Sequence, residues 1–166
     1  MNKTVLAAWL SLGLLSMNAL AEEESFNGFS LDYVQSSLNG VSDSTTGVAM
    51  LRSVRANERY GYEMQFGLFG TIGPYNSSGF LDVSALGLLP LGDNGFTLYG
   101  KVGVADVYSQ GETEKANNLG LTYGVGVEFQ REIGKVRLGL QQLTVGNGTL
   151  SPQRSTIVYG LTLMIK

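Results

Sequence analysis

The chain has no cysteine, no histidine and only 3 prolines among its 166 residues. Without cysteine it forms no disulfide bond and carries no lipid on a cysteine thiol. Without histidine it lacks the general base on which many lipases, acyltransferases and proteases depend. No spacing of metal ligands occurs either. We therefore expect neither an enzyme nor a cofactor or metal site.

Long apolar runs and clustered positive charge are also scarce. Beyond residue 21, no segment approaches the ~18 consecutive apolar residues of a membrane helix. The net charge is −3, and the 11 lysines and arginines form no basic run. We therefore expect no nucleic-acid partner.

The first residues have the features of a secretory signal peptide. Lys3 supplies the positive charge, residues 5–15 form a short apolar stretch, and Ala19-Leu20-Ala21 is an A-x-A cleavage site. A membrane anchor would need about 20 apolar residues, and this stretch is shorter. We expect cleavage of residues 1–21 near Ala21, which leaves residues 22–166 as one exported domain.

Glycine is abundant, with 23 residues, and much of it lies inside segments of alternating apolar residues. In residues 119–129, one face of an extended strand carries only large apolar side chains: Leu119, Leu121, Tyr123, Val125, Val127 and Phe129. The opposite face carries glycine, threonine and Glu128. In a soluble barrel the large side chains would fill the interior. This pattern is typical instead of a membrane barrel, with bulky residues toward lipid and small or polar residues toward a narrow interior.

Seven further segments alternate in a similar way, which predicts an all-β protein. The eight predicted strands are residues 28–35, 47–54, 60–69, 80–91, 96–108, 119–130, 136–145 and 156–165. Most are close to the ~9–11 residues that a tilted strand needs to cross a bilayer. The segment 47–54 fits least well, because Arg52 shares a face with apolar residues. The fold expected over residues 22–166 is an eight-stranded antiparallel up-and-down transmembrane β-barrel.

The predicted connections alternate in length, which orients the barrel. Short turns are expected at residues 55–59, 92–95 and 131–135, and longer loops at 36–46, 71–79, 109–118 and 146–155. Short turns of such barrels face the periplasm and longer loops face outside. Both termini are therefore expected on the periplasmic side of the bacterial outer membrane.

Two segments carry a resemblance to a known family. Leu-Tyr-Gly-Lys-Val-Gly-Val at residues 98–104 and Leu-Thr-Tyr-Gly-Val-Gly-Val-Glu-Phe at residues 121–129 resemble the fifth and sixth strands of the OmpA-like outer-membrane barrels. The resemblance is at family level and covers the barrel domain only. Residues 158–165 are similar to the signal that such barrels present to the barrel-assembly machinery, although the usual final aromatic residue is absent. The resemblance thus implies that machinery as a partner.

Several charged and amide side chains point inward by strand parity: Glu63, Gln65, Lys101, Glu128, Arg137 and Gln141. Counting along the hairpins predicts that Lys101 lies opposite Glu128, and that Glu128 lies opposite Arg137. These residues could form an ion path or a salt-bridged plug. We favour the plug, because eight strands leave room only for side chains. A carboxylate pair for hydrolysis among Asp32, Glu63, Asp82 and Glu128 is disfavoured, because these residues lie on separate strands.

Aromatic side chains are expected at both membrane interfaces, in the girdles that such barrels carry. The periplasmic girdle is predicted from Tyr62, Phe96 and Phe129, and the outer one from Tyr33 and Tyr108. By parity, Asp106 also falls on the outward face, at the level of the lipid headgroups.

Three functions remain open from the sequence. The first is a monomeric structural barrel that stabilises the envelope and contacts outer-membrane lipid and lipopolysaccharide. The second is a surface adhesin or a resistance factor against host defences, which would bind through loops such as 36–46 and 146–155. The third is a soluble lipocalin-like carrier, which would need an apolar interior. We favour the first, because the predicted interior is polar and the loops are short and rich in Ser, Thr, Gly and Asn.

Overall fold

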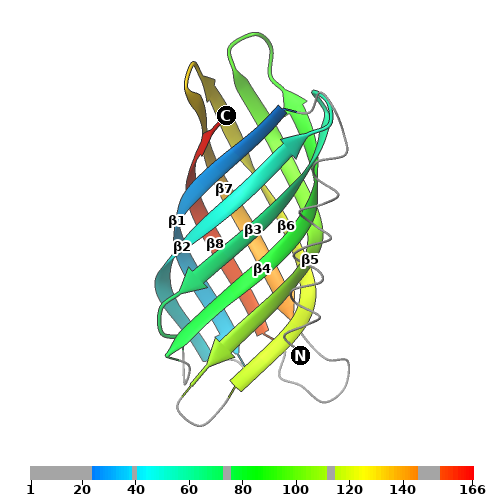
Figure 1. Cartoon of the computed structure of the whole chain (residues 1–166). Coiled ribbons are helices and arrows are strands. Elements are labelled where there is room, and N and C mark those ends of the chain that lie inside the picture. Colours follow the sequence, from blue (N-terminus) through cyan, green and yellow to red (C-terminus); the bar gives the residue numbers. More distant parts are fainter. Residues whose placement is uncertain (1–23, 39–40, 73–75, 112–114, 146–153) are drawn as a thin grey trace.

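The computed structural model describes residues 24–38, 41–72, 76–111, 115–145 and 154–166. The predicted signal peptide lies outside these residues. The described chain forms eight strands: β1 (Glu24–Leu38), β2 (Val41–Arg55), β3 (Tyr60–Phe69), β4 (Ser77–Pro90), β5 (Phe96–Gln110), β6 (Lys115–Arg131), β7 (Gly134–Val145) and β8 (Arg154–Ile165). Each strand is antiparallel to the next, and β1 pairs with β8 to close the barrel. The predicted all-β, eight-stranded antiparallel barrel is confirmed (Figure 1).

All eight predicted segments are strands, but several strands continue further than expected. The predicted loop 36–46 is a hairpin in which Ser37 pairs with Ser42, and most of the predicted loop 109–118 is strand as well. Both loop predictions are wrong for a physical reason. These strand ends are rich in polar residues on both faces, so hydrophobic alternation does not mark them. Of the predicted loop 146–155, residues 146–153 lie outside the described residues.

The three short turns lie at the end of the barrel that also holds Glu24 and Ile165, at the top of Figure 1. In the turn after β2, the side-chain oxygen of Asn57 accepts hydrogen bonds from the backbone N–H groups of Arg59 and Tyr60. In the turn after β4, Gly92 and Gly95 have φ angles of 69° and 79°. These values favour glycine, because it has no Cβ to clash in the left-handed region.

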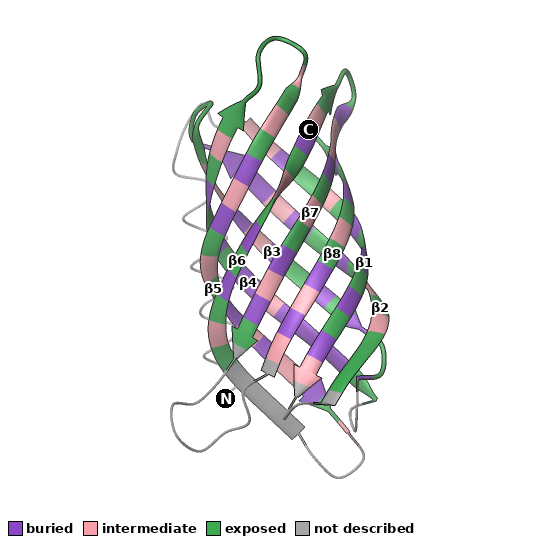
Figure 2. Ribbon diagram, turned by 180° about the vertical axis from the view of Figure 1, so that it is seen from behind, coloured by how far each residue is buried: buried purple, intermediate pink, exposed green. Residues whose placement is uncertain are grey.

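Buried and more exposed residues alternate along most of each strand (Figure 2), so successive side chains point to opposite faces of the barrel wall. The outer face carries a belt of exposed apolar residues, among them Leu31, Met50, Leu121, Val125 and Leu161. Soluble monomers rarely expose so many large apolar side chains on one face, and such a belt suits contact with lipid. None of the described residues belongs to a helix long and apolar enough to cross a membrane.

The interior is more apolar than the sequence suggested. Near the end of the barrel away from the short turns, a buried cluster packs inside: Val34, Phe69, Ile72, Phe80, Ala105, Val107, Leu143 and Val158. A smaller cluster of Phe26, Leu51 and Met164 lies toward the short turns. The expected interior of glycine, hydroxyls and ions is therefore correct only in part. The sequence does not reveal the larger cluster, because a strand with apolar residues on both faces, such as Phe80 and Leu81, shows no clear alternation.

Glycines on the inner face make room for Phe69 and Phe80, the two largest members of the cluster that lies away from the short turns. The rings of Phe69 and Phe80 stack with centroids 5.2 Å apart. A Cβ at Gly67 would lie 2.1 Å from the Phe80 ring, and one at Gly47 would lie 2.6 Å from the Phe69 ring. The aromatic pair therefore depends on both glycines, since packed interiors tolerate little added volume.

We predict that Gly67→Ala destabilises the barrel by about 1–3 kcal/mol, because the added methyl group displaces the buried Phe80 ring. Chemical unfolding of the protein in lipid bilayers measures this change. Gly87→Ala is the matched control, because a Cβ at Gly87 meets nothing within 4 Å. Equal stability of the two variants would show that Phe80 does not need this space.

Candidate functional site

Eight polar side chains meet inside the barrel, on the short-turn side of the cluster that contains Phe69 and Phe80. They come from β2 to β7 and are all buried: Arg55, Glu63, Gln65, Asp82, Lys101, Glu128, Arg137 and Gln141. We call this group the ionic cluster. It contains all six residues that the sequence predicts to point inward, and Arg55 and Asp82 in addition.

Lys101 is the centre of one half of the ionic cluster, the half that lies toward the apolar cluster containing Phe69 and Phe80. Its ammonium donates to Glu63 Oε1 at 3.1 Å, Gln65 Oε1 at 2.9 Å and Asp82 Oδ2 at 3.1 Å. These three acceptors match the three N–H donors of a lysine. Asp82 also accepts a hydrogen bond from Gln141, which donates to Thr122 Oγ1 at 2.8 Å as well.

Glu128 and the two arginines form the other half of the cluster. Glu128 Oε1 accepts from Arg137 Nη2 at 2.7 Å and Nε at 3.1 Å, and it also pairs with Arg55. Arg137 pairs in addition with Glu63 and so joins the two halves. The charges therefore alternate in sign in the order Arg55, Glu128, Arg137, Glu63, Lys101 and Asp82. Such pairing offsets the large cost of burying single charges.

The register decides which predicted pairs form. Glu128 lies opposite Arg137, as predicted. The prediction that Lys101 lies opposite Glu128 is wrong, because Lys101 faces Gly124 and Glu128 faces Thr97. The β5–β6 hairpin closes at a different position from the one assumed, so the two residues are offset along the strands. Glu128 still lies between two cations, but the second cation is Arg55.

Arg55 is the residue that sequence reasoning missed. It was assigned to the turn 55–59, whereas the structure places it at the last position of β2. The available signal was parity, because Arg55 shares its inward face with Leu51 and Ser53, which are also buried. A strand extended by one residue would have placed its guanidinium in the interior.

Aromatic and small residues fill the space around the ionic cluster. The guanidinium of Arg137 lies 4.4 Å from the centroid of the Tyr99 ring, which gives a cation–π contact. A Cβ at Gly139 would lie 1.9 Å from the Tyr99 hydroxyl, so the ring occupies the place of a missing side chain. An interior cavity beside Asp32 measures about 20 Å³, which is room for about one water molecule. Side chains thus fill this part of the barrel.

No group of three or more acidic side chains among the described residues is arranged to hold a metal ion. Asp32 lines the same small cavity as Lys101 and Gln141. One of its oxygens accepts from Ser30 Oγ at 2.5 Å, and the other has no hydrogen-bond partner among the described atoms.

The five residues predicted for the girdles all lie on the outer face. Phe96 and Phe129 lie toward the short turns, with ring centroids 4.5 Å apart, and the guanidinium of Arg131 stacks on Phe129 at 4.4 Å. Tyr62 is half-buried on the same side of the barrel. Tyr33 and Tyr108 lie toward the opposite end of the barrel. Asp106 also points outward near that end, and it is half-buried between Leu81 and Leu119 on the neighbouring strands. Their place at the two membrane interfaces stays a prediction.

A closed antiparallel barrel of eight strands with an apolar outer belt and a filled, charged interior defines the class: it is a β-barrel of the outer-membrane type. No protein-family model matches the sequence, and no curated protein matches it either. The likeness to known proteins therefore lies in the fold.

Three solved structures illustrate that likeness. Neisserial surface protein A (NspA) has a TM-score of 0.71 and 9% sequence identity over 87% of this chain and 98% of its own. Ail, the attachment invasion locus protein of Yersinia pestis, has a TM-score of 0.59 and 16% identity over 86% and 98%. The N-terminal β-barrel domain of Pseudomonas aeruginosa OprF has a TM-score of 0.52 and 10% identity over 84% and 99%. These identities show a shared fold, and the OmpA-like membership stays a resemblance.

We predict that Glu128→Gln lowers the free energy of unfolding by about 2–4 kcal/mol, because it leaves the buried Arg55 without its carboxylate. The temperature at which the folded gel band converts to the unfolded one measures this change. Conductance in a planar bilayer should stay unchanged, since the apolar clusters remain in place.

The matched control is Glu58→Gln, since Glu58 lies exposed in the turn after β2. It should shift the conversion temperature little, because exposed charges contribute at most about 1 kcal/mol. Equal shifts in both variants would mean that the ionic cluster adds nothing to stability.

Proposed function

We propose that this chain is a small integral protein of the bacterial outer membrane with a structural role. It stabilises the envelope through its contacts with membrane lipid and lipopolysaccharide, and it is neither an enzyme nor a channel. The observation that carries the proposal is the arrangement of its two faces. Bulky apolar side chains cover the outside, while paired charges and two apolar clusters fill the inside.

The route to the membrane follows from the same proposal. The signal peptide directs export and is removed near Ala21. Residues 158–165 then engage the barrel-assembly machinery. They lie in β8, the strand that closes the barrel against β1, so their docking is coupled to closure. The finished barrel acts as a monomer, because closure leaves no strand edge for a second copy.

The filled interior argues against an ion path. An ion moving along the axis would have to separate the paired charges of the ionic cluster and then cross the cluster around Phe69 and Phe80. Both steps are costly, because charges in an apolar interior lose their hydration without a partner.

We predict that the purified protein gives no large, stable channels in planar-bilayer recordings. A double variant, Phe69→Ala with Phe80→Ala, should also fail to conduct, because the ionic cluster still blocks the interior. Large and stable channels in the native protein would contradict the plug.

A second candidate is an adhesin or a resistance factor against host defences. The fold likeness to Ail favours it, and Ail has also been solved with the heparin analogue sucrose octasulfate. The β1–β2 hairpin supports it less well. Residues 36–46 contain no lysine or arginine, whereas sulfated ligands are bound by cationic side chains. Most of this segment is also paired strand rather than an open loop.

Cells with and without the gene distinguish the two candidates. We expect a heat-modifiable band in the outer-membrane fraction of cells that carry the gene, and greater detergent sensitivity in cells that lack it. Attachment to host-matrix proteins should be equal in both. A loss of attachment with unchanged detergent sensitivity would instead establish the adhesin.

Complementation with Glu58→Gln serves as the control, because this exposed change should restore detergent resistance fully. A chain that stays in solution without detergent would contradict both candidates and favour the soluble carrier.

A further inference from the structure

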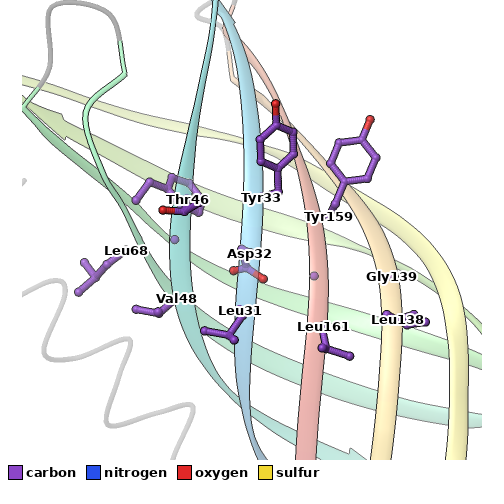
Figure 3. Close-up of a pocket in the computed structure, with 13 residues that line it drawn as sticks. Leu31, Asp32, Tyr33, Thr46, Val48, Leu68, Leu138, Gly139, Tyr159 and Leu161 are labelled. Carbon is purple, nitrogen blue, oxygen red and sulfur yellow. The ribbon is translucent and has the colours of Figure 1, made fainter.

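Asp32 is a buried carboxylate outside the ion pairs of the ionic cluster. It lies on β1 between Leu31 and Tyr33, whose side chains belong to the outer face, so its own side chain points inward (Figure 3). Only 4% of Asp32 is exposed. One carboxylate oxygen accepts from Ser30, the other has no hydrogen-bond partner among the described atoms, and no ion pair within the described chain includes Asp32.

The charges around Asp32 do not balance. In the ionic cluster, three cations pair with three carboxylates. Lys101 and Arg137 line the same cavity as Asp32, but the three N–H donors of Lys101 are bonded to other side chains and Arg137 pairs with two other carboxylates. A further inward cation, Lys135, pairs with Glu24, which lies about 26 Å from Asp32 along β1. An ionised Asp32 therefore adds one negative charge to a cluster that is already neutral.

Glycines on the neighbouring strands leave space beside Asp32. The residues at its level are Gly47 on β2 and Gly160 on β8, and Gly160 pairs in turn with Gly139 on β7. A Cβ at Gly160 would lie 2.9 Å from Asp32 Oδ1, and one at Gly139 would lie 1.9 Å from the Tyr99 hydroxyl. The carboxylate and the tyrosine hydroxyl therefore lie over two adjacent glycines.

The cavity of about 20 Å³ lies at this place, because Asp32, Tyr99, Gly139 and Gly160 all line it. Its volume admits one species of about the size of a water molecule. The lining also contains further hydroxyl and amide side chains, which are Ser30, Gln65, Gln141 and Thr162. Oxygen atoms of several kinds thus surround the space next to a charged carboxylate.

From this geometry we propose that the cavity beside Asp32 binds one small monovalent cation, with sodium as the best fit. Asp32 is the charged ligand, and hydroxyl and amide oxygens of the lining complete the coordination. Oxygen atoms of this kind are the ligands that hard cations prefer. The inference goes beyond the proposed function, since it needs only the folded barrel.

Charge and size select this ligand. A water molecule would satisfy the free oxygen of Asp32 but would leave its negative charge uncompensated in the interior, which is costly. A divalent ion would create a positive excess instead, and no group of three or more acidic side chains in the described ranges is arranged to hold one. A monovalent cation restores neutrality, and sodium is smaller than a water molecule. Caesium and choline are too large for this volume.

The test follows the urea unfolding of the purified chain in phosphatidylcholine bilayers by circular dichroism. Sodium chloride replaces choline chloride stepwise at constant ionic strength. Above the dissociation constant, the equilibrium constant for unfolding should fall roughly tenfold for each tenfold rise in sodium concentration, because the ion binds the folded state. Caesium chloride in place of choline chloride should leave it unchanged.

Two variants locate the effect. Asp32→Asn removes the charged ligand and keeps the shape of the side chain, so it should abolish the sodium dependence. In choline chloride it should be at least as stable as the native chain, because it also removes the uncompensated charge. Asp93→Asn is the matched control, since Asp93 lies exposed in the turn after β4. It should keep the full sodium dependence.

Four results would overturn the cation site. A sodium dependence that persists in Asp32→Asn, or equal stabilisation by sodium and caesium, would assign the effect to salt in general. An infrared band of a protonated carboxyl group that disappears in Asp32→Asn would show that Asp32 holds a proton instead. A native chain with neither this band nor any sodium dependence would leave a water molecule as the ligand of the cavity.

Discussion

Backbone hydrogen bonding is the constraint on which this structure depends. A chain inside a bilayer has no water to satisfy its N–H and C=O groups, so every one of them has to be paired within the protein. The pairing of β1 with β8 meets this demand by closing the sheet. Closure then separates an outside from an inside, and eight strands set an interior that only side chains can fill. The apolar belt and the ionic cluster both follow from that separation.

Two kinds of side chain fill the narrow interior of the barrel. Paired charges occupy the middle, where Arg137 links Glu128 to Glu63. One apolar cluster closes the end away from the short turns, and a smaller one packs beside the charges. Glycines such as Gly67 and Gly139 complete the packing, because a ring from another strand occupies the space above each of them. The same residue type that gives the sequence its alternating small face therefore serves the packing of aromatic side chains.

The ionic cluster shows how far parity reasoning extends. Glu128 and Arg137 could be paired from the sequence, because the turn between β6 and β7 is short and leaves little freedom of register. Lys101 could not be paired, because the β5–β6 hairpin closes within a polar segment whose length the alternation does not reveal. Its partners Glu63 and Asp82 come from β3 and β4, and Arg55 was taken for a turn residue. The hydroxylated strand ends were missed for the same reason, since hydrophobic alternation stops where the polar region begins.

The sequence by itself determined the eight strands, their antiparallel order and the face that carries the apolar belt. These properties are local, because a period of two residues tells inward from outward along a single strand. The tertiary structure decided the height of each residue on the barrel. It brought Arg55, Lys101 and Arg137 together with three carboxylates, stacked Phe69 on Phe80, and aligned the leucines, tyrosines and serines of β8, β1 and β2 into one wall. Parity carries no information on height, which depends on the register of strands that are distant in the chain and meet only when the barrel closes.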